Sequence, residues 1–406
     1  MNFRNVFLEF GYNKEEIDAR LEETFQNMFY GPEGEKIYYE VGDDMGYFTD
    51  TGNNDVRTEG QSYGMMMCVQ LNKKEEFDRI WKWTKTYMYL SEGVNAGYFC
   101  WSNQTDGKKN SQGPAPDGEE FFAAALILAS RRWGDGEGIF NYSNEAVAIM
   151  KAMLHNPVPM YDYETKYIKF VAGCNYSDPS YHLPHFYELY ADELKKKAAE
   201  CKDTAEADEL IKDAGFYEEA AVESRKYFEK SCHPETGMSA EYAQYDGTPF
   251  EGEWTQWGRH DYFYSDAYRT AANMGLDYSW CIVKNIECAA VEKERTAALR
   301  KFFEKEVKFD SEGPHFGVYE IDGKPVAKED DSETASSGVA LHPYGLLATL
   351  AMSYLATDPE EGDKAEGSWA VRKFWELPLR KGRRRYYDNC LYLFAFMALS
   401  GNYRFY

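Results

Sequence analysis

Apolar side chains recur along most of the chain at the spacing that places them on one face of a helix. The pattern occurs at residues 63–71, 77–88, 122–133, 264–272, 347–354 and 391–399. A turn at Asn72 separates the first two segments and predicts a helical hairpin, and Gly134 predicts the end of the third helix. Many stripes are rich in Ala, Met and aromatic residues, as in helices buried on more than one side. The pattern predicts an all-α chain of roughly ten to twelve helices, with inner helices wrapped by outer ones.

Strand-like segments are few and local. KIYYEV at residues 36–41 and HFGVYEIDGKPVA at residues 315–327 are the clearest, and the Asp-Gly pair of the second predicts a hairpin turn. The segments 101–118 and 244–261 are long, Gly-rich and turn-rich, which is typical of functional loops. No linker, low-complexity tract or exact repeat interrupts the pattern, so a single domain of residues 1–406 is predicted.

The charge of the chain limits the classes of molecule that it is expected to bind. The sequence has 45 Lys and Arg against 69 Asp and Glu, a net charge of −24, which argues against nucleic acid or an anionic membrane and favours a neutral substrate. Aromatic residues make up 17% of the chain. Their flat rings suit either a packed core or a groove that stacks on sugars, and both interpretations stay open. The oligomeric state is open as well.

The cysteines and the amino terminus indicate the cellular compartment in which the protein is expected. The eight cysteines are scattered without any CxxC pair, which predicts reduced buried thiols and no structural zinc site. The amino terminus lacks the pattern of a secretory signal, and no apolar run approaches the length of a membrane span. We therefore expect a cytoplasmic protein that needs no cofactor and no metal.

Glu59, Asp117 and Asp266 are the candidate catalytic residues. Each lies where a loop gives way to a helical pattern, so each can be held at a helix start and aimed into a shared cleft. Hydrolysis of a glycosidic bond needs one protonated carboxyl and one ionised carboxylate on opposite faces of the sugar. The alternative for Glu59 and Asp117 is simple helix capping, and for Asp266 an ion pair with Arg269.

Four segments together resemble glycoside hydrolase family 8, whose members are inverting enzymes with an (α/α)6 barrel. They are TEGQSYGMMMCVQL, APDGEEFFAAALILASRRWG, DPSYHLPHFYEL and YSDAYRTAANMGLD. The resemblance spans nearly the whole chain. In addition, Leu341, His342 and Pro343 are similar to the loop that closes one end of the cleft in the subgroup that releases xylose from the reducing end of oligosaccharides.

The resemblance implies a role for each matching carboxylate. Glu59 matches the general acid of the family, Asp266 the general base, and Asp117 a third acid that contacts the distorted sugar. Tyr181 matches a tyrosine that helps to hold the attacking water, although Tyr187 is an alternative. Inversion requires room for that water, so we expect roughly 6.5 to 9.5 Å between the acid and base carboxyl groups.

Three further residues are predicted to contact or support the substrate. Arg269 lies one helical turn after Asp266 and could orient its carboxylate. Trp101 is either a core ring or a stacking platform, and His342 is either a surface loop residue or a ligand of the terminal sugar. The basic run KGRRRYYD at residues 381–388 is interpreted as a solvated face.

The resemblance implies an inverting hydrolase that removes xylose from the reducing end of short β-1,4-xylooligosaccharides. One alternative keeps the fold and the acids but acts internally on xylan, glucan or chitosan. A second alternative is a sugar-binding protein without catalytic activity. The length of the products separates the first two, and hydrolysis of xylotriose excludes the third.

Overall fold

Helices dominate the structure, a computed structural model that describes residues 3–252 and 259–406. Residues 253–258 of the predicted 244–261 loop lie outside the described residues. The described residues contain thirteen α-helices, close to the predicted number. The chain divides into two units. Unit 1 comprises Met1–Lys36, Tyr176–His182 and Arg225–Arg404, and unit 2 comprises Ile37–Asn175, Leu183–Ser224 and Phe405–Tyr406. The prediction of a single domain stays a prediction.

Unit 2 holds the first helical hairpin and two short antiparallel sheets. Its helices are α3 (Thr58–Gln70), α4 (Lys74–Tyr87), α5 (Pro116–Trp133), α6 (Tyr142–His155) and α7 (Pro184–Glu200). Strand β1 (Tyr38–Val41) pairs with β2 (Met45–Phe48), and β3 (Val56–Arg57) pairs with β4 (Ser102–Asn103). Helix α8 (Thr204–Ser231) begins in unit 2, and its residues from Arg225 onward belong to unit 1.

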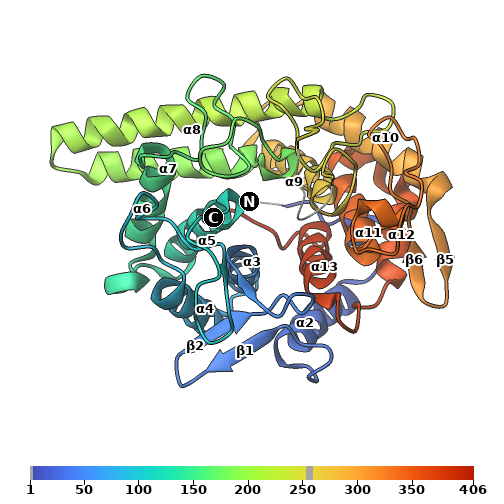
Figure 1. Ribbon diagram of the computed structural model, residues 1–406, viewed down its shortest axis with the longest axis horizontal. Helices are drawn as coiled ribbons and strands as arrows, with labels where there is room; N and C mark the ends of the chain where they lie inside the picture. Colours follow the sequence, from blue (N-terminus) through green and yellow to red (C-terminus); the bar gives the residue numbers. More distant parts are fainter. Residues whose placement is uncertain (1–2, 253–258) are drawn as a thin grey trace. The chain divides into compact units, whose positions relative to one another are not determined.

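The two helices of the hairpin differ in burial as their sequences predict. Helix α3 is rich in Met and Gly, and all of its residues except Glu59 are buried. Helix α4 instead buries one face, which includes Phe77, Ile80 and Trp81, and carries Lys and Glu on the other. Helix α3 is therefore an inner helix and α4 an outer one. Figure 1 shows α3 beside α4 and α5, and both of these helices pack against it.

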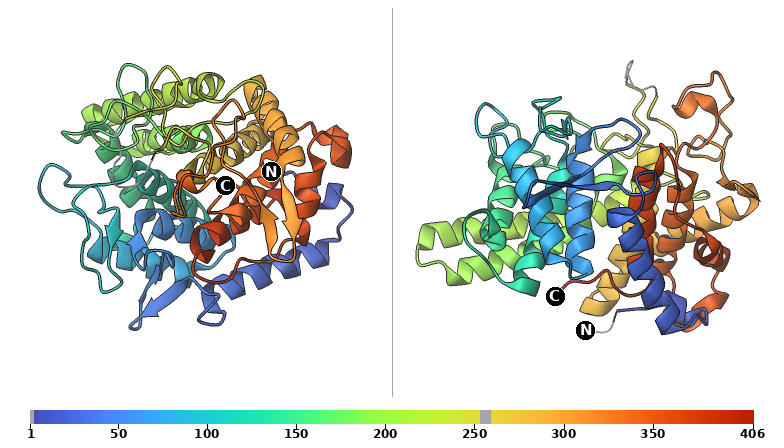
Figure 2. Two further views of the ribbon diagram at one scale, coloured as in Figure 1. Left: turned by 45° about the vertical axis from the view of Figure 1, so that its right-hand side comes forward. Right: turned by 90° about the horizontal axis from the view of Figure 1, so that it is seen from below.

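Unit 1 is built around α13. Its α-helices besides the end of α8 are α1 (Val6–Glu9), α2 (Lys14–Tyr30), α9 (Tyr268–Lys284), α10 (Ala290–Glu306), α11 (Pro343–Met352), α12 (Ser368–Glu376) and α13 (Arg385–Leu399). Strands β5 (Lys308–Asp310) and β6 (Gly313–His315) form a hairpin. Every residue of α13 is buried. Helix α11 packs on α13 and on α9, an arrangement that Figures 1 and 2 show from three sides.

The structure confirms several predicted elements and corrects two. The hairpin around Asn72, the helix end at Gly134 and the turn at Asp322 and Gly323 are present. The helical pattern predicted at residues 264–272 becomes a regular helix only from Tyr268, and Asp266 lies in the 3-10 turn η3 (Ser265–Ala267) directly before α9. The basic run at residues 381–388 is not simply a solvated face, because Arg385 and Asp388 are buried. None of the described helices is long and apolar enough to cross a membrane.

Candidate active site

Glu59 and Asp117 each stand second in a regular helix of unit 2. Glu59 follows Thr58 at the start of α3, and Asp117 follows Pro116 at the start of α5. Proline suits the first helical position because its fixed φ is already helical and it has no N–H to leave unbonded. The two helix starts lie close together, since a Cβ on Gly118 would be 2.5 Å from Cβ of Thr58. A glycine at that position therefore allows the two helix starts to approach each other closely.

We use the name acid region for Glu59, Asp117 and Trp101. The Thr58 N–H donates to the carbonyl oxygen of Trp101 at 3.0 Å, which ties the segment before the 101–118 loop to the start of α3. The Trp101 ring is half-buried, and the Arg57 guanidinium lies over it at 5.4 Å from the centroid. Arg57 also pairs with Asp50 and Asp55. The ring is therefore neither a fully buried core residue nor a bare platform.

Two buried acids that were not predicted as site residues, Glu119 and Glu120, follow Asp117 in α5. Glu119 accepts a hydrogen bond from the Phe99 N–H at 2.9 Å, and burial raises the pKa of its carboxyl well above the ordinary value. Glu120 accepts a hydrogen bond from the Tyr187 hydroxyl at 2.6 Å. Tyr187, the alternative to Tyr181, is thus bound to an acid inside unit 2.

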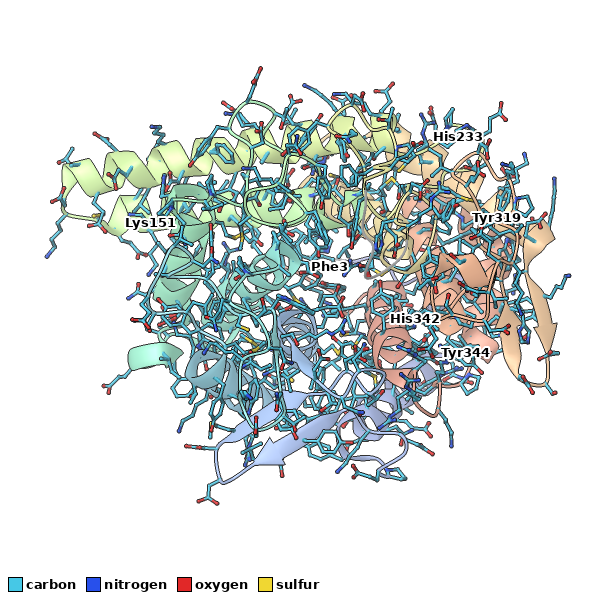
Figure 3. All side chains as sticks on the ribbon, viewed as in Figure 1. Phe3, Lys151, His233, Tyr319, His342 and Tyr344 are labelled. Atoms are coloured by element: carbon cyan, nitrogen blue, oxygen red, sulfur yellow. The ribbon has the colours of Figure 1, made fainter. Side chains whose placement is uncertain are left out.

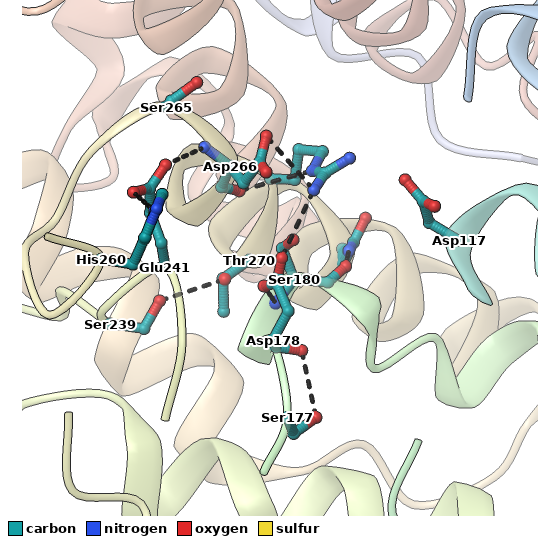
Figure 4. Close-up of polar contacts among 12 residues, drawn as sticks. Asp117, Ser177, Asp178, Ser180, Ser239, Glu241, His260, Ser265, Asp266 and Thr270 are labelled. Carbon is teal, nitrogen blue, oxygen red and sulfur yellow. Dashed lines mark hydrogen bonds and ion pairs between the residues drawn. The ribbon is translucent and has the colours of Figure 1, made fainter. Parts of the chain in front are cut away.

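Asp266 belongs to unit 1, where a strained turn presents it. Ser265 has a φ of +35°, which lies in the region that disfavours residues with a side chain. The carbonyl oxygen of Ser265 accepts a hydrogen bond from the Tyr387 hydroxyl, and the Asp266 N–H donates to Oε1 of Glu241, each at 3.3 Å. Oε2 of Glu241 is 2.8 Å from Nδ1 of His260 (Figure 4). Tertiary contacts therefore hold the turn in place.

Arg269 joins Asp266 to a second carboxylate, Asp178. Its Nη2 lies 3.4 Å from Oδ1 of Asp266 and 3.5 Å from Oδ2 of Asp178. Asp178 is fully buried and accepts a hydrogen bond from the Ser180 N–H at 2.7 Å (Figure 4). Burial raises the pKa of Asp178 well above its ordinary value, and the nearby charge of Arg269 opposes that shift. The predicted contact between Arg269 and Asp266 is present.

Tyr181 lies in η2 (Pro179–Tyr181), the 3-10 turn that Asp178 caps. The Arg269 guanidinium sits over the Tyr181 ring at 5.5 Å from the centroid. Unit 1 therefore brings Asp266, Arg269 and Tyr181 together, and Tyr187 is not part of this group. We use the name base region for these residues together with Asp178, Glu241 and Ser265.

His342 is buried rather than exposed, which excludes the interpretation as a surface loop residue. It precedes α11, and Figure 3 labels it together with Tyr344. Its Nδ1 is 2.9 Å from Oδ2 of Asp388, and its ring makes an edge contact with Tyr387 at 4.8 Å between centroids. Because the Tyr387 hydroxyl reaches the Ser265 carbonyl, one residue of α13 connects the His342 loop with the turn of Asp266.

Asp178, Glu241 and Asp388, which were not predicted, contact the predicted site residues in unit 1. Asp178 had a local signal, because an Asp followed by Pro is typical of a cap before a helical turn. Glu241 and Asp388 had none, since their partners are distant in the chain. Within the described residues, no group of three or more His, Cys, Asp and Glu side chains could hold a metal ion.

Comparison with known proteins places the chain in a family. The family model for glycosyl hydrolases family 8 matches residues 42–313. A reducing end xylose-releasing exo-oligoxylanase of Halalkalibacterium halodurans is 48% identical over 99% of this chain and 94% of its own length. The chain belongs to glycosyl hydrolases family 8. Its enzymatic class is therefore glycosidase, as predicted.

Solved structures extend the family 8 assignment to the fold. A crystal structure of a reducing end xylose-releasing exo-oligoxylanase superposes with a TM-score of 0.86, at 48% identity, and covers 99% of this chain and 96% of that one. A mutant of Rex8A from Paenibacillus barcinonensis, complexed with an arabinofuranosyl-xylotetraose, has a TM-score of 0.87, at 45% identity over 100% of this chain and 97% of that one. The fold of the family 8 chain is thus the predicted (α/α)6 barrel with small local strands.

Proposed function

We propose that this family 8 glycosidase releases xylose from the reducing end of short β-1,4-xylooligosaccharides. The observation that carries the proposal is the likeness to three relatives that bear the name of this activity, at 44 to 48% identity over nearly their whole length. The segment Leu341, His342 and Pro343, which resembles the cleft-closing loop of that subgroup, adds support. We propose a cytoplasmic location as well, in keeping with the eight free cysteines.

In the proposed mechanism, Glu59 is the general acid and Asp266 the general base. Glu59 gives its proton to the leaving glycosidic oxygen, while Asp266 takes a proton from the water that attacks the anomeric carbon from the other face. The anomeric configuration is inverted because the attack is direct and forms no intermediate on the protein. The distance between the two carboxyl groups stays a prediction.

The surrounding residues support these two roles. Arg269, whose Nη2 lies 3.4 Å from Oδ1 of Asp266, is the residue that we propose to orient the carboxylate of the base. Tyr181, which lies under the Arg269 guanidinium, is the tyrosine that we propose to hold the attacking water. We propose that Asp117 binds the sugar beside the scissile bond and that Trp101 borders the same sugar chain.

The experiment that tests the proposed specificity compares xylotriose with its alditol. We expect the enzyme to convert xylotriose into xylobiose and xylose, with a label on the reducing end recovered in the monosaccharide. The alditol should be hydrolysed at least about tenfold more slowly, since a site built for a cyclic sugar hydroxyl leaves its polar groups unpaired when the ring is open. Equal rates on both, or internal cuts in polymeric xylan, would instead favour the endo-acting alternative.

A further inference from the structure

His342 is held by a buried network that the start of α13 supplies. Asp388 has no exposed side-chain surface and receives three hydrogen bonds. They come from Nδ1 of His342 at 2.9 Å, from Nη1 of Arg380 at 2.5 Å and from the Gly345 N–H at 2.6 Å. Both carboxylate oxygens are thus used as acceptors, the arrangement that suits the ionised form of Asp388, which has no proton to donate.

The charges in this network are compensated within it. Burial alone would raise the pKa of Asp388, but His342, through its charge when protonated and its hydrogen bond, and the charge of Arg380 outweigh that effect, and the pKa is lowered. Arg380 also donates to the carbonyl oxygen of Leu341 at 2.8 Å. Asn389 binds the backbone N–H and carbonyl of Arg380 at 2.8 and 2.9 Å. The loop before α11 is therefore fixed at Leu341, His342 and Gly345.

The two nitrogens of the His342 ring have different surroundings. Because Asp388 can only accept, the proton of the neutral ring is bound at Nδ1, and Nε2 keeps its lone pair. Among the residues that the structure describes, no group makes a hydrogen bond to Nε2. The ring edge that carries Nε2 can therefore accept a hydrogen bond from a ligand hydroxyl.

We propose that Asp388, supported by Arg380, is a positioning residue that fixes His342 in its Nδ1–H tautomer, so that Nε2 accepts a hydrogen bond from the anomeric hydroxyl of the terminal xylose. The inference rests on the proposed release of xylose from the reducing end. It assigns the preference for a free reducing end to a buried carboxylate that does not touch the sugar. Without Asp388, the same ring could carry its proton on Nε2 and would then offer a donor in place of an acceptor.

A simpler role for Asp388 is structural. A carboxylate that accepts the Gly345 N–H caps the first turn of α11 and interacts favourably with the helix dipole. The variant Asp388→Asn separates the two roles, because its side-chain oxygen can still accept the Gly345 N–H while its amide group can donate to Nδ1 of His342. Asp213→Asn is the matched control, since Asp213 is also buried and bonds Nε2 of His155 at 2.8 Å, on helices α8 and α6.

The test combines kinetics with the tautomeric state of His342. Nitrogen NMR of the histidine-labelled full-length enzyme, assigned with His342→Gln, should show the proton of neutral His342 on Nδ1 in the unmodified enzyme. In Asp388→Asn we expect a larger fraction with the proton on Nε2. We also expect about a tenfold loss in kcat/KM for xylotriose, mainly through KM, because an acceptor for the substrate hydroxyl is lost. The preference for xylotriose over its alditol should fall by a similar factor.

Four results decide between the proposed role of Asp388, a purely structural role and failure of the proposed function. Asp213→Asn should change neither the tautomer of His342 nor the preference for xylotriose. A neutral His342 protonated on Nε2 in the unmodified enzyme would overturn the inference whether or not any variant folds, and so would an unchanged preference in Asp388→Asn. If the unmodified enzyme hydrolyses xylotriose and its alditol equally well, the proposed function itself fails, whatever the tautomer.

Discussion

The acid region and the base region hold their carboxylates by different means. Glu59 and Asp117 stand in the first turns of regular helices, and the close approach of Gly118 to Thr58 sets the two helix starts side by side. Asp266 instead stands after a residue with a positive φ, in a turn held by contacts with distant side chains. The acid region is therefore built by local helix geometry and backbone packing, whereas the base region is built by a polar network.

This difference predicts which changes each region tolerates. A helix start keeps its geometry when a neighbouring polar side chain is replaced. Where two helix starts are packed so closely that a methyl group has no space, however, an added methyl group forces them apart. A strained turn keeps its geometry only while the contacts that hold it are present.

The largest effects are expected from the two proposed catalytic residues. Glu59→Gln and Asp266→Asn should each lower kcat on xylotriose by about 10² to 10⁴-fold. On β-xylobiosyl fluoride, whose leaving group needs little protonation, Glu59→Gln should recover most of its rate and Asp266→Asn should not. The control Glu75→Gln changes an acid in the first turn of α4 and should leave both rates intact. A rescue of Asp266→Asn but not of Glu59→Gln would reverse the two roles.

Removal of Glu241 should damage the base region without removing a catalytic group. Glu241→Met loses the acceptor for the Asp266 N–H, and a shift of the carboxylate by about 1 Å can cost up to 10²-fold in rate. We expect kcat to fall by about 10- to 100-fold with a change in KM below about threefold. Steady-state kinetics on both xylotriose and the fluoride should show this loss, since the base acts in each reaction.

Ser265→Gly changes the same turn but should relieve its strain rather than remove a contact that holds it. Glycine accepts a φ of +35° more readily than serine, so this change should preserve kcat and raise the free energy of unfolding by up to about 1 kcal/mol. A loss of activity in Ser265→Gly, or full activity in Glu241→Met, would show that the network does not hold the turn.

The acid region should be sensitive to a single methyl group. In Gly118→Ala the new Cβ would meet Cβ of Thr58 at 2.5 Å, so the helix starts must move apart. We expect a loss of about 1 to 3 kcal/mol in the free energy of unfolding. Gly215→Ala in α8 is the control, because beyond its chain neighbours and its own helix backbone no heavy atom of the described residues lies within 4 Å of the position that its new Cβ would take, and alanine favours a helix by about 1 kcal/mol. Chemical denaturation measures both, and equal stability changes would contradict the packing argument.

A smaller effect concerns pH and the segment that carries Tyr181. His182 is fully buried, its ring nitrogen Nε2 lies 2.9 Å from the Ser177 hydroxyl, and burial lowers its pKa to about 3. The unfolded chain binds a proton at this residue near pH 6.5, whereas the folded chain does not, so stability falls as the pH drops from about 6.5 towards 3.

The size of that effect can be measured between pH 7 and pH 6. The linkage predicts a loss of about 0.7 kcal/mol in the free energy of unfolding from His182 over this interval. Denaturation of the unmodified enzyme and of His182→Gln at both pH values should show that the variant loses less stability on acidification. An identical loss in the two proteins would mean that His182 takes up its proton in the folded state.

The acid region could be predicted from the sequence because its signals are local. Pro116 followed by Asp117, and the apolar period after Glu59, identify two helix starts without knowledge of the fold. The base region could be predicted only in part. The spacing of Arg269, one turn after Asp266, indicates their contact, whereas Glu241 contacts Asp266 across 25 residues and leaves no local pattern.

The run at residues 381–388 shows why composition can mislead. Its four cationic residues suggest a solvated face, and Lys381 and Arg383 are indeed exposed. The Arg385 guanidinium, however, donates to the carbonyl oxygens of Lys36 and Glu33. Asp388 of the same run holds His342. Only the positions of distant carbonyl groups and of the His342 loop distinguish these residues from their exposed neighbours.

The proposed mechanism, in which Glu59 gives a proton to the leaving oxygen and Asp266 activates the attacking water, predicts inversion at the anomeric carbon. Proton NMR during the first minutes of xylotriose hydrolysis tests it most directly, because the new reducing end of xylobiose reports the stereochemistry before mutarotation. Direct attack by the water that Asp266 activates predicts that α-xylobiose appears first from the β-linked substrate. Initial appearance of β-xylobiose would contradict the proposed mechanism, since it would require a covalent intermediate and a different role for Asp266.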